Sequence, residues 1–429
     1  MTDAHSTNQT IRRVSPTLFS FLSDLGLRAV YPQDIPFQAA QAKGKELNAT
    51  IGQITDGHGN AMTLPSMSST LSGMSPAEAN RAFLYSPIQG VEELRQGWRG
   101  WQRRGRDAAQ ASTVPLVTVG LAHGISLAAD LFSAPSRAVA VAAPFWGNYR
   151  QIFSTRTGAR LLTAAAVVDG RYNCDAIAQA LQDLPQGEPA IAILNLPWNP
   201  GGYMPTVAER QALRESLVAV AQMRPLMVIC DDAYAGLVYE DEVPRESMFW
   251  DLNGAHERLV PVKVDGITKE LAFFGGRVGF LTFPFPPDSE IALALESKVK
   301  CLVRATVGSP VAISQVIALH GLRDGSIEDE VERIRVVLEG RYHRLKQVFA
   351  AMTSRYLTPL PFNSGCFALV ELSTELGQSS EQIRHRLLDD YDTGLVSIAP
   401  NFLRIAFCSM ESEALPELVH RLQLAVDSG

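Results

Sequence analysis

The chain has 429 residues, of which 46% are hydrophobic and 19% are charged, and its formal net charge is −7. This composition is typical of a globular protein with a large buried core, and the length allows two or three domains. The negative charge argues against a nucleic-acid-binding surface, which needs a basic patch. No apolar stretch of the sequence is long enough to span a bilayer.

The five cysteines are scattered along the chain, and no pair has the spacing of a zinc site or of a CxxC motif. This usage is typical of a reducing compartment, where cysteine serves as a small buried hydrophobe. The polar start MTDAHSTNQT lacks the apolar core of a signal peptide. We therefore expect a cytoplasmic protein without a metal site and without a nucleic-acid or membrane partner.

Short apolar runs alternate with helical patterns between about residues 107 and 305. We expect the runs to be strands buried on both faces, with helices between or beside them. The expected strands are residues 159–167, 189–196, 226–234 and 278–283, and the expected helices are residues 121–132, 207–223 and 289–303. This alternation predicts an α/β fold with a mainly parallel sheet sandwiched by helices.

The pattern changes after residue 325. Residues 328–352 have the period of one long amphipathic helix, and two strand-like runs and a last helix follow it. This order is typical of a smaller α+β domain. We expect a large domain over residues 56–325, and a discontinuous small domain formed by residues 1–55 and 326–429.

The first motif in chain order is TVGLAHGISLAADLF, in which Gly120 lies between a strand end and an amphipathic helix. Free amides at a helix start can bind phosphate. The stretch lacks the GxGxxG pattern, which argues against a dinucleotide-binding dehydrogenase. A glycine that only ends the strand is the alternative.

Two apolar runs end in polar residues. NLPWNPGGYMPT follows the run that ends at Asn195, and LMVICDDAYAGLVYE carries Asp231 and Asp232. Loops at the carboxyl edge of such a sheet bind ligands, and a buried carboxylate there could hold a ring nitrogen protonated. The alternatives are a Pro/Gly turn with two capping asparagines in the first stretch, and an aspartate that caps the next turn in the second.

Two cationic side chains lie in apolar surroundings. Lys269 in DGITKELAFFGGRVGF is followed by Arg277 eight residues later, and Arg404 lies within NFLRIAFCSM. A buried cation is costly unless its charge is paired or removed. Lys269 could therefore be chemically occupied and Arg404 could hold a carboxylate, unless both only extend their charged ends into water.

The order and spacing of these motifs over about residues 30 to 410 resemble the fold-type-I pyridoxal-phosphate enzymes. The nearest likeness is to class I aminotransferases of the aspartate and aromatic type. NATIGQITDGHGNAMTLPS resembles the family's N-terminal glycine loop and YSPIQGVEELR its tyrosine–glycine segment. The remaining matches are the helix-start cup, PFWGNYRQIF, the N-P-G loop, D-x-A-Y, the lysine–arginine pair and the late arginine.

The resemblance implies a pyridoxal 5′-phosphate cofactor and roles for the residues around its ring. Lys269 would hold the cofactor as a Schiff base and later shuttle a proton. Asp231, selected over Asp232 by the D-x-A-Y register, would pair with the ring nitrogen. Tyr234 and Asn199 would bond the phenolic oxygen. Trp146 would stack on the ring.

The phosphate and the substrate would be held by a second set of residues. Arg277 and the cup residues Gly120, Leu121 and Ala122 would hold the phosphate, with Tyr85 reaching it from a neighbouring subunit. The resemblance also implies a homodimer that acts in turn on an amino acid and a 2-oxo acid.

The substrate's α-carboxylate would be bound by Arg404, with Asn199 and the backbone of Gly52. Arg304, in LVRATVGSP, matches the arginine that binds a distal carboxylate across the dimer. Acidic or aromatic amino acids are therefore the expected donors.

The chain departs from the family pattern in three places. Gly266 stands where a serine usually precedes the lysine, the cup has no hydroxyl group, and Gly308 replaces a serine after Arg304. Thr268 or water could supply the missing phosphate donor. A lyase, decarboxylase or synthase on the same fold is an alternative, as is a non-catalytic regulator that binds the cofactor.

Overall fold

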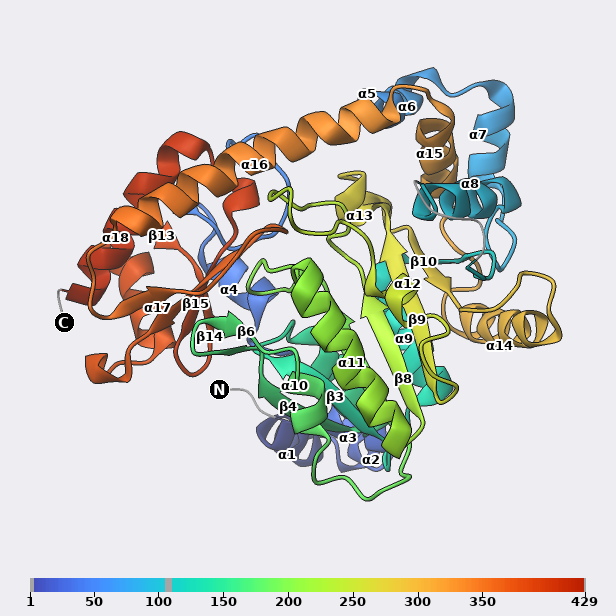
Figure 1. Cartoon of the computed structure of the whole chain (residues 1–429), viewed down its shortest axis with the longest axis horizontal. Coiled ribbons are helices and arrows are strands. Elements are labelled where there is room, and N and C mark those ends of the chain that lie inside the picture. The colour runs from blue at the N-terminus through green and yellow to red at the C-terminus, as the bar shows by residue number, and fades with distance from the viewer. Residues whose placement is uncertain (1–3, 105–109, 428–429) are drawn as a thin grey trace.

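A central seven-stranded sheet dominates the computed structural model, which describes residues 4–104 and 110–427 (Figure 1). The strand order is β2-β10-β9-β8-β7-β3-β4, parallel from β9 to β4, and β10 is antiparallel to both its neighbours. The strands are β2 (Leu116–Thr118), β3 (Ala138–Ala143), β4 (Arg160–Ala165), β7 (Ala190–Asn195), β8 (Leu226–Asp231), β9 (Leu259–Gly266) and β10 (Gly279–Thr282).

Helices cover both faces of this sheet. The longer ones are α8 (Glu92–Gln102), α9 (Gly120–Phe132), α11 (Val207–Met223), α14 (Glu290–Thr306) and α15 (Ala312–Arg323). Figure 1 shows α11 in front of the sheet and α9 behind it. The mainly parallel, helix-covered sheet expected from the alternating pattern is confirmed.

Side-chain alternation along the strands divides the core into two clusters. Ile193 and Ile229 pack on the α9 face, whereas Ala192 and Cys230 pack on the α11 face. The expectation of strands buried on both faces holds for β7 and β8. It is wrong for β4, because this strand lies at the sheet edge and its side chains are largely accessible to solvent.

The C-terminal part forms a second, four-stranded antiparallel sheet in the order β11-β12-β15-β14. Its strands are β11 (Leu357–Pro359), β12 (Ala368–Leu372), β14 (Val396–Ile398) and β15 (Phe402–Ile405), and its helices are α16 (Ile327–Ala351), α17 (Ser380–Asp390) and α18 (Leu415–Asp427). Figure 1 shows α16 running from α15 to this sheet.

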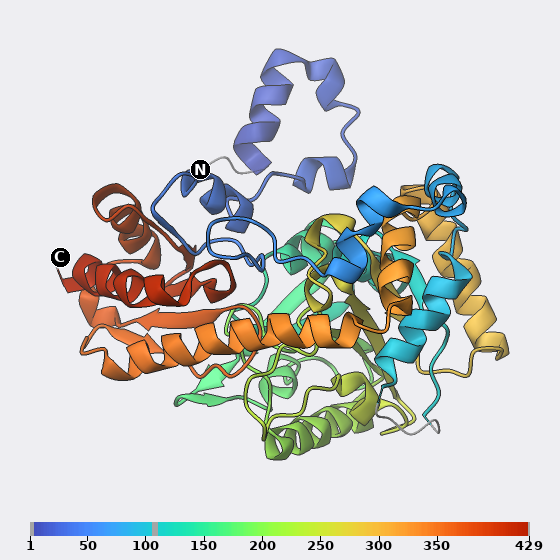
Figure 2. The same cartoon turned by 90° about the horizontal axis from the view of Figure 1, so that it is seen from above.

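The N-terminal segment meets both parts of the molecule. β1 (Leu47–Asn48) pairs in parallel with β13 (Thr393–Gly394) beside the smaller sheet. Three N-terminal helices project from the surface in Figure 2, namely α1 (Ala4–Val14), α2 (Pro16–Phe19) and α3 (Asp24–Arg28). The domain boundaries at residues 55 and 325 stay a prediction, and residues 105–109 of the expected large domain lie outside the described part.

Short elements complete the fold. They are α4 (Ile35–Gln41), α5 (Pro65–Ser68), α6 (Thr70–Gly73), α7 (Pro76–Phe83), α10 (Ala176–Ala180), α12 (Met248–Leu252), α13 (Ile267–Glu270), β5 (Val167–Val168) and β6 (Arg171–Tyr172), a π-helix (Arg150–Thr157) and four 3₁₀ turns (Phe274–Gly276, Thr374–Leu376, Phe407–Ser409, Ser412–Ala414). Across residues 4–104 and 110–427, no helix is both long and apolar enough to cross a membrane.

Candidate active site

The ends of three parallel strands open into one cavity at the carboxyl edge of the large sheet. β7 ends at Asn195 and β8 at Asp231, which are paired in register, and β9 leads directly into α13 with Lys269. The cavity has a volume of about 120 Å³. It is lined by Leu121, Ala122, Trp146, Asn195, Asn199, Asp231, Ala233, Tyr234, Thr268, Lys269 and Arg277. Besides Leu121 and Ala122, six of the residues implied by the resemblance to the enzyme family therefore line this one cavity.

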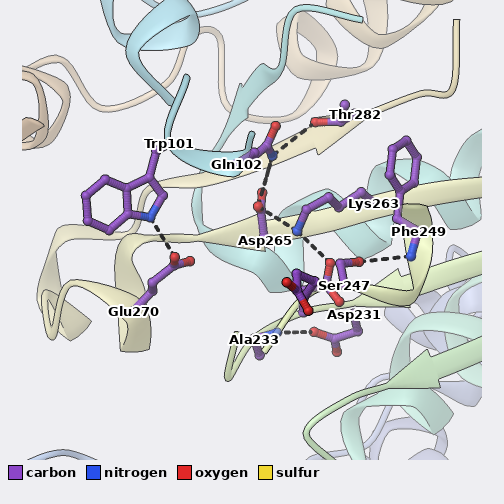
Figure 3. Close-up of polar contacts among 12 residues, drawn as sticks. Trp101, Gln102, Asp231, Ala233, Ser247, Phe249, Lys263, Asp265, Glu270 and Thr282 are labelled. Carbon is purple, nitrogen blue, oxygen red and sulfur yellow. Dashed lines mark hydrogen bonds and ion pairs between the residues drawn. The ribbon is translucent and has the colours of Figure 1, made fainter. Parts of the chain in front are cut away.

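Asp231 carries the carboxylate of the cavity. The Tyr149 hydroxyl donates to its Oδ2 at 2.5 Å. The Ala233 amide donates to its Oδ1 at 3.2 Å (Figure 3). Burial raises the pKa of Asp231 to about 6, against the Tyr149 hydrogen bond and the nearby Lys269 charge. A buried carboxylate is stabilised by a nearby positive charge, so it can form a hydrogen bond with a protonated ring nitrogen.

Asp232 faces the opposite side of the sheet, since successive side chains of a strand alternate. Its Oδ2 lies 2.6 Å from the Lys263 Nζ, on the face away from the cavity. Asp232 is therefore already paired, and Asp231 is the one of the two aspartates that lines the cavity.

Lys269 lies in the short helix α13, with its Nζ 5.1 Å from the centre of the Tyr234 ring. Burial lowers the pKa of Lys269, although the Asp231 carboxylate opposes this shift. A neutral amine is the form that attacks a carbonyl carbon. The surroundings therefore favour a nucleophilic lysine.

Arg277 and the start of α9 form the other end of the cavity. Arg277 directly follows the Phe274–Gly276 turn and has a left-handed backbone (φ 51°). A Cβ on Gly120 would lie 2.4 Å from the Arg277 Nη2, and Gly120 itself has φ +74°. Glycine at position 120 thus lets a guanidinium lie against a helix N-terminus, an arrangement that favours an anion.

Thr268 has a buried hydroxyl group that no described residue bonds. Its Oγ1 is one of few such buried atoms in residues 4–104 and 110–427, and the residue lines the cavity with Arg277. Buried polar atoms are almost always satisfied. Together, the unpartnered hydroxyl, the guanidinium and the glycine cradle fit the phosphate of pyridoxal phosphate, and the lysine and the carboxylate fit its aldehyde and its ring nitrogen.

Arg404 extends from β15 towards the same loops. Its Nη1 donates to Asn199 Oδ1 at 3.3 Å and its Nη2 to the Thr50 carbonyl at 2.7 Å, while its buried Nε has no described partner. The guanidinium lies 4.1 Å above the Phe367 ring. Burial lowers the pKa of Arg404 to about 10. A guanidinium with a spare donor and no paired carboxylate is suited to bind a carboxylate ligand.

Other expected residues lie at different distances from the cavity. Trp146 lines it and meets the Tyr149 ring edge to face, with the ring centres 5.4 Å apart. A Cβ on Gly52 would lie 2.3 Å from the Phe367 ring, so Gly52 lies beside the ring under Arg404. Tyr85 is 98% exposed, and Arg304, near the C-terminal end of α14, is also exposed. A single copy of the chain does not bring Tyr85 or Arg304 into the cavity.

Tyr149 and Phe367 are site residues that sequence reasoning missed. Tyr149 lies in the quoted segment PFWGNYRQIF, three residues after Trp146, but a buried tyrosine there is indistinguishable from a core aromatic by pattern alone. Phe367 lies within the strand-like run 361–372. Only the fold brings their partners Asp231 and Arg404, which are distant in sequence, into contact with them.

Comparison with known proteins gives consistent results. Residues 45–422 match the model of the family described as aminotransferase class I and II. An aspartate aminotransferase of Thermotoga maritima is 25% identical over 345 residues, which cover 79% of this chain and 82% of that protein.

Solved structures share the fold. An aminotransferase from Anaerococcus prevotii superposes with a TM-score of 0.79 at 20% identity, over 93% of this chain and 97% of the other. A kynurenine aminotransferase from Pyrococcus horikoshii also gives a TM-score of 0.79, at 16% identity, over 96% of this chain and 98% of the other.

Proposed function

We propose, from the premise that this chain belongs to the class I and II aminotransferase family, that the cavity beside Lys269 is its catalytic site. The chain is a pyridoxal-5′-phosphate-dependent aminotransferase, which moves an amino group between an amino acid and a 2-oxo acid in two successive half-reactions. The lyase, decarboxylase, synthase and regulator alternatives are not favoured by these relatives.

The main support for this site is one small cavity that is lined by Lys269, Asp231 and Arg277. When bound, pyridoxal phosphate supplies an electron sink for the pair of electrons released at the substrate's Cα, provided its ring nitrogen is protonated. Asp231 would hold that proton, with Tyr149 fixing the carboxylate. Asn199 and Tyr234, joined by a 3.3 Å hydrogen bond, would orient the phenolic oxygen.

Lys269 would bond the cofactor covalently in the resting enzyme. When it is free of the cofactor, the Lys269 amine would move the proton at the substrate's Cα. Burial lowers the pKa of Lys269, which favours the neutral amine that accepts this proton. The indole of Trp146 would cover the face of the ring.

The phosphate would be held by Arg277, the amides at the start of α9 and the Thr268 hydroxyl. Thr268 therefore replaces the donors that a cup of Gly120, Leu121 and Ala122 lacks. A test is Thr268→Val against Thr268→Ser: we expect the valine variant to lose affinity for pyridoxal phosphate and the serine variant to retain it.

Arg404 would bind the α-carboxylate of every substrate, beside Asn199 and Gly52. For the side chain, we propose acidic or aromatic donors, with Arg304 of a second copy binding a distal carboxylate. Tyr85 of the same second copy would reach the phosphate. The high exposure of both residues in a single chain supports a homodimer. The cytoplasmic location expected from the cysteine usage stays a prediction.

A donor screen tests the substrate proposal. Purified enzyme carrying the cofactor is mixed with one amino acid at a time and no acceptor. The amount of 2-oxo acid released per active site is then measured. A transaminase releases one equivalent and stops until an acceptor is added, whereas a lyase continues to release product. Arg304→Ala is then compared on an acidic and an aromatic donor. Loss on the acidic donor alone supports distal-carboxylate binding, and equal loss on both contradicts it.

A further inference from the structure

A buried ion cluster lies directly behind the proposed cofactor site. It consists of Lys263 between Asp232 and Asp265, with its Nζ 2.6 Å from one carboxylate and 2.8 Å from the other. The three side chains are at most 4% exposed. Figure 3 shows Lys263 pointing towards Asp265 from the neighbouring part of β9.

The ion cluster and the cavity share the same two strands. Asp232 follows Asp231 in the chain, and its amide donates to the Val264 carbonyl at 2.9 Å. Val264 is itself the register partner of Asp231 and lies between Lys263 and Asp265. Because side chains alternate along a strand, only backbone separates the cluster from the Asp231 carboxylate.

Both carboxylates of the ion cluster contact the ammonium group between them, although burial raises the pKa of Asp232. Trp98 Nε1 and Gln102 Nε2, both from α8, donate to Asp265 at 3.1 Å and 2.9 Å. Burial opposes the charge on Lys263, but the carboxylates of Asp232 and Asp265 outweigh it and raise the pKa of Lys263. One lysine between two aspartates leaves the cluster with one net negative charge.

We propose that this net negative charge raises the proton affinity of the ring nitrogen that pairs with Asp231, so that Asp232, Lys263 and Asp265 act as positioning residues for the reaction. The inference rests on the role proposed above for Asp231. The other titratable groups that face Asp231 are Tyr149, Tyr234 and Lys269, all on the cavity side. On the far side, the cluster lies beside Glu270, whose pKa is raised to about 7 by burial and by the charge of Asp265.

The physical basis is the weak screening of charges inside a protein. One uncompensated charge separated from another by a strand backbone shifts a proton equilibrium by about one pH unit at the effective dielectric of a protein interior. The alternative role for the cluster is purely mechanical, in which the ion pairs only hold β8 and β9 together. The two roles predict different signs for combined substitutions.

Three variants separate these roles. Asp232→Asn is close to isosteric and leaves the cluster neutral. Lys263→Met leaves two aspartates that share one proton, so the cluster stays negative. The double variant breaks every ion pair but keeps the charge of Asp265, which Trp98 and Gln102 still stabilise. Lys298→Met, at an exposed lysine, is the control.

The readout is the pH at which the bound ring nitrogen loses its proton, followed by NMR with cofactor labelled at that nitrogen. Infrared difference titration of the Asp231 carboxyl in the cofactor-free protein gives a second readout, and thermal unfolding reports folding. We expect Asp232→Asn to lower the midpoint by about one pH unit. We expect Lys263→Met not to lower it and the double variant to recover most of the loss.

A mechanical role would give the opposite order. If the double variant titrates lower than Asp232→Asn alone, or if Lys263→Met lowers the midpoint as much, the proposal is wrong. Asp231→Asn separates this failure from a failure of the proposed function. If Asp231→Asn leaves the nitrogen titration unchanged, the role of Asp231 itself is wrong, and otherwise only the role of the cluster is in question.

Discussion

The Asp231 carboxylate is suited to bind the cofactor, but its burial lowers the stability of the cofactor-free protein. Burial raises the pKa of Asp231 from its usual range near 4 to about 6. The folded chain therefore binds more protons than the unfolded chain between these two values. It follows that the contribution of Asp231 to stability falls as the pH rises from about 4 to 6 and stays lost above that.

We predict that Asp231→Asn makes the cofactor-free protein more stable at pH 8. The amide cannot ionise and still accepts the Tyr149 hydrogen bond, so the free energy of unfolding rises by about 3 kcal/mol at pH 8 and by less at pH 5. Urea unfolding at the two pH values measures this. Asp232→Asn is the control, since it loses a lysine partner and is destabilised at both. An Asp231→Asn protein less stable than the parent at pH 8 contradicts the prediction.

Arg404 should be needed for every substrate, because every amino acid has an α-carboxylate. Removing one partner of a buried charge pair costs about 3–5 kcal/mol, or roughly two to four powers of ten in kcat/KM. We therefore expect Arg404→Ala to lose this factor on acidic and aromatic donors alike, in steady-state assays. Affinity for pyridoxal phosphate should change little. A loss confined to one donor class would show that Arg404 binds the side chain of the substrate and not its α-carboxylate.

At the scale of elements, the junction of β2 and α9 depends on one glycine. Gly120 has a positive φ, and a Cβ there would overlap the Arg277 guanidinium. We expect Gly120→Ala to weaken binding of pyridoxal phosphate at least tenfold, because the backbone strain of about 1 kcal/mol adds to the displacement of Arg277. Fluorescence titration of the cofactor-free protein measures this.

The matched control is Gly100→Ala in α8. A Cβ on Gly100 meets nothing within 4 Å, and alanine favours a helix. This variant should bind the cofactor normally and be no less stable. If both glycine variants bind pyridoxal phosphate as the parent does, the close approach of Arg277 to the helix start has no role in binding.

The elements that the sequence predicted best are those with an uninterrupted pattern. β7, β8, α11 and α16 begin and end close to the expected residues. β9 was not among the expected strands, because Pro261 and the charged Lys263 and Asp265 interrupt its apolar run. Its charged side chains contact residues of α8 and the end of β8, and the local sequence pattern cannot predict contacts between such distant segments. The edge position of β4 was missed for a related reason, since strand order is a property of the whole sheet.

The candidate site was predictable to the extent that its residues follow strand ends. Asp231, Lys269 and Asn199 meet because parallel strands bring their carboxyl ends to one edge. The residues Tyr149 and Phe367 reach the site through packing between segments far apart in the chain, and no spacing rule identifies such contacts. The hydroxyl of Thr268 was expected as one of two ways to complete the phosphate site, and this role stays a prediction.

At the scale of the whole molecule, the roles proposed for Tyr85 and Arg304, which are both exposed in a single chain, predict that activity requires two copies. Lys269→Ala and Arg304→Ala should each be inactive towards an acidic donor. Mixed and allowed to exchange subunits, they should recover up to about a quarter of the parent activity through hybrid dimers with one intact site. Mass spectrometry of differently tagged copies verifies the exchange. Hybrid dimers without activity would mean that Arg304 acts within its own chain or not on the substrate.

The pairing of β1 with β13 has a consequence for how the chain is made. Leu47 leaves the ribosome early, but its strand partner Thr393 is translated only near the end of synthesis. Strand β1 therefore stays unpaired while the strands of the large sheet are synthesised. Such distant pairings fold slowly and expose strand edges in the meantime. Nascent chains that stall before residue 393 should consequently be the forms that chaperones retain and proteases remove.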